Sequence, residues 1–418
     1  MLLWGDLHNH CGITYGFGSL QNALKIARSH LDFCCITGHA MWPDIYARTP
    51  ETEFIVDFHR EGFKKLLDHW AEMARQNDGE LVTFQSYEMH SSLYGDHHII
   101  SPDDTFPLIY RDSPARLVAD CGVRAIAVPH HIGYTPGYRG INWELYDQNI
   151  SPCVEVCSKH GCAMSETAPY PYYHDMGPRD SRNTVYAGLR RGSRFCFLGS
   201  TDHHAGFPGS YGDGLTAVLA KEKSREAIWE ALLSGRAYAV TGDRIECDFT
   251  VNGQGLGETV RGAKRKLRCA VKGEYWADKL VIYKNCRPLA VLCGEQLRPK
   301  PARAYKLRVE MGWGNSEELT RWAGRITTDG RLAGANLYLR GRSLLSPTNH
   351  DGSPVEVNEI DNRVLEQDTQ AFAWQCETVR NKSTLHPQTD AVVAEIEGGP
   401  DTVVNVTVNG RTHTASIA

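Results

Sequence analysis

The stretch Gly5-Asp6-Leu7-His8-Asn9-His10, close to the start of the chain, places an acid and two histidines at alternate positions. It follows the short hydrophobic run Leu2-Leu3-Trp4, which is typical of a buried strand. Successive side chains of a strand point to opposite faces, so Asp6, His8 and His10 would share one face. Three potential ligands at the end of one strand predict half of a metal site.

Other short hydrophobic runs along the chain also end in a histidine or an acid. Asp202-His203-His204 follows the run at 195–199 and repeats the arrangement of the first motif. The remaining potential ligands, which follow runs at 33–37, 81–84, 125–129 and 154–156, are His39, Glu88, His130, His131 and His160. A single histidine of this kind usually belongs to the core or the surface. Six strand ends that each carry a potential ligand indicate a shared metal centre.

The ligand types suggest the chemistry of this centre. Histidine, aspartate and glutamate without cysteine favour Zn²⁺, Mn²⁺ or Fe²⁺. The candidates outnumber the ligands of one tetrahedral ion, so we expect two or three divalent ions, with Glu88 as a bridging carboxylate. Ions about 3.5–4 Å apart activate a shared water and hold both the attacking and the leaving oxygen. The pattern therefore predicts hydrolysis by a metal-bound hydroxide, and the sequence has no G-x-S-x-G nucleophile motif.

The amino-acid composition limits the kinds of partner that the protein is expected to bind. The 418 residues include 45 basic and 50 acidic ones, a balance that argues against binding to nucleic acid or an anionic membrane. No hydrophobic run approaches the ~20 residues of a membrane span, and the first motif begins too early for a signal peptide. The 13 cysteines lack zinc-ribbon spacing and are expected to be reduced in a cytoplasmic protein. We expect a small-molecule substrate, and the sequence leaves a homo-oligomer open.

The first 243 residues alternate strand and helix patterns, which predicts an α/β domain with a parallel sheet. Helices are expected at about 20–31 after Ser19 as N-cap, at 56–75, and at 224–234 before Gly235. Ligands at the ends of several parallel strands favour a (β/α) barrel, where the chemistry lies at the C-terminal ends of the strands.

Residues 244–418 have a different texture, with short alternating segments in place of helical periodicity. Asn409-Gly410 lies between two such segments and predicts a hairpin. We expect an antiparallel β-sandwich-like domain, in one or two β units, with a long loop or an internal boundary at 343–361.

Taken in order, the motifs resemble those of the PHP (polymerase and histidinol phosphatase) superfamily over residues 1–243. They are Asp6 to His10, Thr37-Gly38-His39, Glu88, Pro129-His130, His160 and Asp202-His203-His204. The stretches 154–161 and 237–243 resemble the subgroup that carries a C-terminal β domain and includes carbamate and other metallohydrolases.

The resemblance implies a distorted (β/α)₇ barrel with up to three ions. By position, His8 and His10 would hold one ion with Glu88 and Asp202; Glu88, His130 and His160 a second; and His39 and His204 would contribute to a third. The sequence departs from the family at Gly38, where an aspartate is usual. Tyr15 stands where some members place a further ligand, so a mononuclear or binuclear centre is also compatible.

Other residues near the motifs receive supporting roles. We expect Asp6 to orient a ligand histidine from behind, and Glu88, Asp202 and His204 to be the catalytic residues. The candidates for substrate binding are His98, His131, Arg139, Lys159 and His203, among which the basic residues would suit an anionic group.

The leading prediction is a metal-dependent phosphoesterase acting on a small phosphate ester. A carbamate, ester or amide hydrolase is the first alternative, because the same nucleophile attacks a carbonyl. A non-catalytic binding protein stabilised by its metal is the second.

Overall fold

The computed structural model describes residues 1–14, 16, 18–41, 65–109, 111–168, 179–273, 277–293, 304–312, 320–338, 362–378 and 390–417. The chain divides into two compact units. The described residues of the first lie in Met1–Gly273, and those of the second lie in Glu274–Ser343 and Glu356–Ala418. The expected feature at 343–361 lies outside the described residues.

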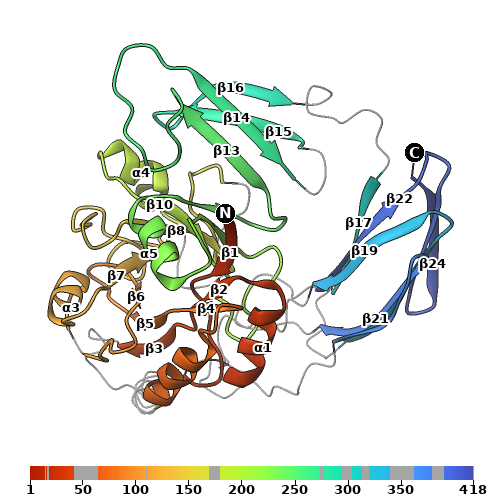
Figure 1. Ribbon diagram of the computed structural model, residues 1–418, viewed down its shortest axis with the longest axis horizontal. Helices are drawn as coiled ribbons and strands as arrows, with labels where there is room; N and C mark the ends of the chain where they lie inside the picture. Colours follow the sequence, from red (N-terminus) through yellow and green to blue (C-terminus); the bar gives the residue numbers. More distant parts are fainter. Residues whose placement is uncertain are drawn as a thin grey trace. The chain divides into compact units, whose positions relative to one another are not determined.

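The first unit is a mixed α/β structure (Figure 1). Its strands are β1 (Leu2–Asp6), β2 (Phe33–Cys34), β3 (Gly38–Met41), β4 (Val82–Thr83), β5 (Gln85–Met89), β6 (His97–Ser101), β7 (Ile126–Pro129), β8 (Cys153–Ser158), β9 (Gly161–Cys162), β10 (Cys196–Gly199), β11 (Leu215–Leu219), β12 (Ala237–Val240), β13 (Glu246–Val251) and β14 (Leu267–Lys272). Its helices are α1 (Leu20–His30), α3 (Pro114–Asp120), α4 (Val185–Arg190), α5 (Arg225–Leu233) and a 3₁₀ turn, η1 (Ser181–Asn183).

Three sheets carry the candidate ligands, in the orders β12-β11-β1-β2-β4, β3-β5-β6-β7 and β10-β8-β9. Strand β7 contacts β8, and β10 contacts β12, so neighbouring sheets lie against one another. The expectation of a parallel sheet is only partly right. The pairs β1–β2, β2–β4, β3–β5 and β8–β10 are parallel, whereas β5–β6, β6–β7, β1–β11 and β11–β12 are antiparallel. A short connection such as 90–96 can join only antiparallel neighbours, since parallel ones need a longer crossover.

The expected helices 20–31 and 224–234 are present. Ser19 accepts a hydrogen bond from Asn22 N, as predicted for an N-cap, and Ser224 caps α5 in the same way by accepting from Ala227 N. Of the third expected helix, residues 65–76 are helical and the part before Lys65 lies outside the described residues. Leucine and alanine side chains of α1 and α5 enter the hydrophobic cores that surround the strands.

The second unit is built of antiparallel strands. They are β15 (Lys279–Lys284), β16 (Arg287–Cys293), β17 (Ala304–Met311), β18 (Thr320–Thr328), β19 (Arg331–Tyr338), β20 (Arg363–Gln367), β21 (Ala371–Thr378), β22 (Asp390–Glu397), β23 (Val403–Val408) and β24 (Arg411–Ser416). The sheets β17-β22-β19 and β20-β21-β18-β23-β24 share one core around Phe372 and Trp374, and β15 pairs with β16. The predicted hairpin is confirmed: Asn409 and Gly410 join β23 to β24 with φ of 45° and 78°.

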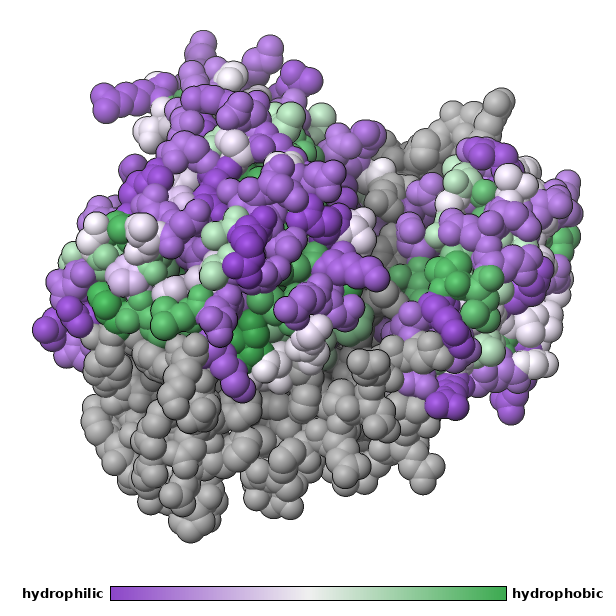
Figure 2. Space-filling model, turned by 60° about the horizontal axis from the view of Figure 1, so that its bottom comes forward, coloured by the Kyte–Doolittle hydropathy of each residue, from purple (hydrophilic) through white to green (hydrophobic). Residues whose placement is uncertain are grey.

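On the face shown in Figure 2 the described surface is mostly hydrophilic, and the structure also shows the state of the helices and of the cysteines. In Figure 2 hydrophilic residues cover most of the described surface on that face, and hydrophobic ones gather in smaller patches. Among the described residues, no helix is long and hydrophobic enough to span a membrane. All 13 cysteines are described, and none of them is joined in a disulfide.

Candidate metal centre

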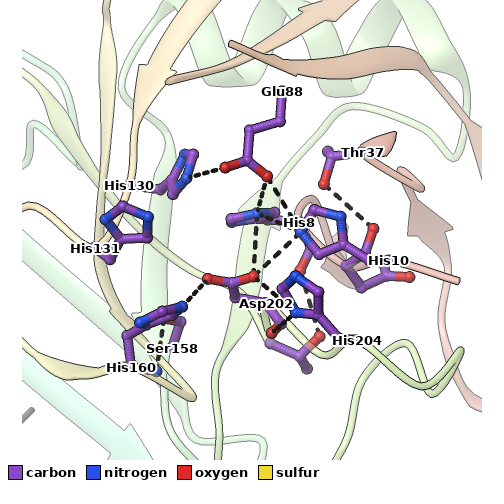
Figure 3. Close-up of polar contacts among 12 residues, drawn as sticks. His8, His10, Thr37, Glu88, His130, His131, Ser158, His160, Asp202 and His204 are labelled. Atoms are coloured by element: carbon purple, nitrogen blue, oxygen red, sulfur yellow. Dashed lines mark hydrogen bonds and ion pairs between the residues drawn. The ribbon is translucent and has the colours of Figure 1, made fainter. Parts of the chain in front are cut away.

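The predicted ligands come together at the ends of the strands of the first unit (Figure 3). They follow β1, lie on β3 and β5, and follow β7, β8 and β10, and they are His8, His10, His39, Glu88, His130, His160, Asp202 and His204. All eight side chains are buried. Residues separated by up to about half the chain therefore share one interior cluster.

The Glu88 carboxylate lies between several imidazoles. Its Oε1 is 3.0 Å from His130 Nε2, and its Oε2 is 3.3 Å from His10 Nε2 and 3.6 Å from His8 Nε2. Oε2 is also 3.3 Å from His39 Nδ1. The two oxygens thus face different histidines, an arrangement that suits a carboxylate bridging two ions.

Asp202 faces Glu88 across the cluster and divides its contacts in the same way (Figure 3). Its Oδ2 is 2.8 Å from His160 Nε2, whereas its Oδ1 is 3.2 Å from His10 Nε2 and 3.4 Å from His8 Nε2. Asp202 has a φ of 49°, which is uncommon for a residue other than glycine. The backbone is therefore held in a strained conformation where this carboxylate enters the cluster.

Two pairs of ring nitrogens face each other inside the cluster. His8 Nε2 lies 3.1 Å from His10 Nε2, and His39 Nε2 lies 3.0 Å from His204 Nε2. Atoms that bind one ion at about 2.0–2.2 Å lie about 3.0–3.6 Å from one another. The observed nitrogen and oxygen separations fall in or close to this range, so the donor set fits divalent ions without rearrangement.

The protonation states also fit metal ligation. Burial lowers the pKa of His10 and His130, which keeps these imidazoles neutral. Burial would lower the pKa of His8 as well, but Asp202 and Glu155 hold it above the usual value. Metal ligation needs a neutral imidazole with a free lone pair, so an ion would take the place of the His8 proton.

His98 provides a further test of fit. It pairs directly with Glu88 across β5 and β6, and its ring lies 4.7 Å from that of His8 and 5.4 Å from that of His130. Both of its nitrogens are buried without a hydrogen-bond partner among the described residues. Such a group costs about 1–3 kcal/mol unless something satisfies it. Residues that can together hold an ion include His8, His98 and His130, and His10, His39 and His204.

The other predicted site residues occupy the surroundings of the cluster. Asp6 accepts hydrogen bonds from Thr201, Gly209 N and His8 N, so it holds the backbone near His8 rather than an imidazole. Burial raises its pKa to about 6. His203 Nδ1 accepts from Ala205 N.

The basic candidates are paired with acids. Arg139 donates to Asp96 at 3.1 Å, and Lys159 lies 2.8 Å from Asp213. His131, whose φ is 30°, lies with its Nε2 3.5 Å from Asp96. The charges of Arg139 and Lys159 are thus already balanced within the protein.

Residues outside the predicted set hold the ligands from behind. Glu155 Oε2 accepts from His8 Nδ1 at 2.9 Å, and Tyr134 OH lies 2.9 Å from His160 Nδ1. His90 Nε2 lies 2.7 Å from His39 Nδ1. One signal was available in the sequence: His90 stands two residues after Glu88 and continues the alternation of a strand.

Gly38, where the resemblance led us to expect an aspartate, leaves little room for a larger side chain. A Cβ at this position would approach Leu66 Cδ2 to 2.6 Å and Thr14 Cγ2 to 3.0 Å. Leu66 is fully buried, so an aspartate here would require the packing of the helix at 65–76 to change. Tyr15, the other departure, lies outside the described residues.

Comparisons with known proteins add sequence relatives in one bacterial group. The chain is 24% identical over 280 residues to an uncharacterized protein of Chlamydia trachomatis, which covers 63% of this chain and 43% of that protein. A protein of Chlamydia muridarum matches at 24% over 283 residues with the same coverage. The chain thus spans less than half the length of these curated relatives. No family model matches the sequence.

Among solved structures, the chain is similar to a two-domain protein from Bacteroides vulgatus that contains a predicted PHP-like metal-dependent phosphoesterase. That match has a TM-score of 0.37 at 14% identity and covers 100% of this chain and 95% of the other. A lesion-specific endonuclease from Pyrococcus furiosus matches at a TM-score of 0.33 and 13% identity over 57% of this chain and 58% of the other. Both TM-scores are low, and the chain's own residues carry the functional assignment.

Proposed function

We propose that the first unit is a metal-dependent hydrolase of PHP type, with the barrel fold of that superfamily, and that it cleaves a small phosphate ester. One observation carries the proposal. Four imidazoles turn their Nε2 atoms toward two carboxylates that face each other in a buried cluster, and these residues are His8, His10, His130, His160, Glu88 and Asp202.

The ligand sets that the resemblance implies form the rest of the proposal. His8, His10, Glu88 and Asp202 would hold one ion, and Glu88, His130 and His160 a second, although His160 Nε2 lies nearest Asp202 Oδ2. His39 and His204 face each other and suit a third. When bound, two or three Zn²⁺, Mn²⁺ or Fe²⁺ ions would supply an activated water and polarise the scissile bond.

The protein's own groups prepare this chemistry. Glu155 holds His8 by its Nδ1, which leaves Nε2 directed at the cluster. The two oxygens of Glu88 face different histidines, and so do those of Asp202, so each carboxylate sets the spacing between the histidines that it contacts. The antiparallel pairing of β5 with β6 holds Glu88 beside His98.

The charge balance favours an anionic substrate. Three carboxylates contact the cluster, those of Glu88, Asp202 and Glu155, so two divalent ions would still leave positive charge in excess. The nearby cations Arg139 and Lys159 add no net positive charge, because they are paired with Asp96 and Asp213. A phosphate ester would neutralise the excess charge, whereas a neutral amide would not. His131 and His98 are our candidates for contact with its phosphate group.

The test is turnover by the purified protein after its metal content is measured. Nitrophenyl phosphate, phosphodiester and carbamate panels separate the proposal from an acyl hydrolase. We expect hydrolysis of phosphate esters and its loss in Asp202→Asn. His413→Asn, at an exposed residue on β24, is the matched control. Turnover of acyl substrates alone would overturn the phosphoesterase assignment. A variant that loses its fold, in a protein that turns over nothing, would indicate a structural metal.

A further inference from the structure

A chain of buried hydrogen bonds runs away from His39 on the side opposite His204. His39 Nδ1 lies 2.7 Å from His90 Nε2, and His90 Nδ1 lies 3.0 Å from Asp96 Oδ2. The rings of His39 and His90 are nearly parallel, with an interplanar angle of 9°. Asp96 accepts further hydrogen bonds from Ser91 N and Arg139. All of these side chains are buried.

The positions of the protons on His90 and His39 follow from Asp96, the acceptor at the far end of this chain of hydrogen bonds. Asp96 accepts hydrogen bonds from Ser91 N and from the Arg139 guanidinium, which is always charged, so its side chain is a carboxylate acceptor. The proton between Asp96 and His90 must therefore sit on His90 Nδ1. A neutral His90 then has a lone pair on Nε2 and accepts from His39 Nδ1. The lone pair of His39 is left on Nε2, which faces His204.

The geometry points to Asp96 and His90 as positioning residues that fix the tautomer of His39 and aim its Nε2 lone pair at the metal centre. This inference rests on the proposed metal centre but not on the reaction that it catalyses. A carboxylate behind a ligand histidine holds the ring and makes the ligand more basic. Here the carboxylate acts through a second imidazole.

Two neighbouring contacts support the same assignment. Glu88 Oε2 lies 3.3 Å from His39 Nδ1, farther than His90 Nε2, so His90 is the nearer acceptor. Glu88 Oε1 lies 3.3 Å from His90 Nδ1, and Asp96 Oδ2 is again nearer at 3.0 Å. A Glu88 carboxylate committed to ions would accept even less from either ring. Binding of metal would thus strengthen the chain from Asp96 to His39.

The test measures the affinity of the full chain for Co²⁺ by equilibrium titration, followed by the visible absorption of the bound ion. His90→Phe keeps the shape of the ring but removes the acceptor for His39. We expect affinity for one of the ions to fall about 10–100-fold, the usual effect of losing such a partner. His90→Gln, whose amide oxygen can accept from His39, should recover most of the affinity.

The matched control is His69→Phe, which replaces a buried histidine bonded to Ile36 O outside the cluster. It should keep the affinity of the wild type. Equal affinities of His90→Phe and the wild type, or an equal loss in both phenylalanine variants, would overturn the inference. If His90→Phe does not fold, His90→Asn takes its place, because its amide is too short to reach His39.

The outcome is separable from that of the proposed function. A wild type that binds Co²⁺ and responds to the His90 variants supports the positioning role even if no phosphate ester is hydrolysed. A wild type that binds no ion overturns both.

Discussion

The interiors of the two units differ in what they bury. The first unit encloses carboxylates and imidazoles at the ends of its strands, whereas the core of the second is formed by side chains such as Phe372, Trp374 and Val392. Among the described residues of the second unit, the buried polar ones are only Thr328, Glu377, Thr378 and Asp390.

The two buried acids of the second unit have simple partners. Glu377 accepts from the exposed Arg321, and Asp390 accepts from Asn362. A cluster such as that of the first unit is costly, because buried charges and unpartnered imidazoles lose their hydration. We therefore expect the second unit to be stable by its own packing, and the first unit to gain stability from bound ions that compensate its buried charges.

Asp202→Asn should produce the largest effect. The amide keeps the shape of the side chain but removes the charge that faces His10 and His160. Metal catalysis contributes several kcal/mol, so we expect kcat/KM to fall on the order of 10³-fold together with metal content. Steady-state kinetics and elemental analysis of one preparation check both. Unchanged turnover in a metal-free variant would contradict the assignment.

Removal of metal should affect the thermal stability of the two units differently. An ion present at about 1,000 times its Kd stabilises the state that binds it by about 4 kcal/mol. Dialysis against a chelator should therefore lower the melting temperature of the first unit and leave that of the second unchanged, as calorimetry can show. Asp202→Asn should not respond to the chelator. A shift of both transitions would mean that stability does not divide as the two interiors suggest.

Gly324→Ala should weaken the second unit alone. Gly324 pairs with Trp374 across β18 and β21, and a Cβ on Gly324 would meet the indole ring of Trp374. Overpacking of a tight core costs about 1–3 kcal/mol, so the melting temperature of the second unit should fall while metal content and turnover stay constant. Gly399→Ala, where nothing lies within 4 Å of a Cβ, is the control. Equal stability of the two variants would show that the core can repack.

Some structural features of the two units could be predicted from the sequence, and others could not. Alternation along a strand is local, so the approach of His8 and His10 to each other could be predicted, as could the hairpin at Asn409-Gly410 and the N-cap at Ser19. The order of the motifs also indicated that distant strand ends meet, and the structure brings these residues together. Their roles as ligands stay predictions.

Strand direction and the partners behind the ligands could not be predicted in the same way. A hydrophobic run such as Ile99-Ile100 does not tell whether β6 is parallel or antiparallel to β5. Glu155 reaches His8 only because β8 and β1 end near each other, although 147 residues separate them. Such contacts depend on sheet pairing, which is not a local property of the chain.

The smallest expected effect concerns His69, a buried histidine in the helical residues 65–76 of the first unit. Burial lowers its pKa to about 4, against a hydrogen bond to Ile36 O that works in the other direction. Between pH 6.5 and 4 the unfolded state takes up a proton that the folded state does not, so stability falls as the pH falls. At pH 6 the loss is about 1 kcal/mol for this one group.

His69→Gln should flatten that part of the pH dependence, because the amide nitrogen can still donate to Ile36 O but does not titrate. The difference between wild type and variant in the free energy of unfolding, measured by denaturant titration from pH 8 to pH 5, isolates this contribution from the histidines of the cluster. His69→Asn should flatten it equally but lower stability at every pH, since its side chain does not reach Ile36. If His69→Gln keeps the slope of the wild type, His69 does not contribute to the acid sensitivity of the first unit.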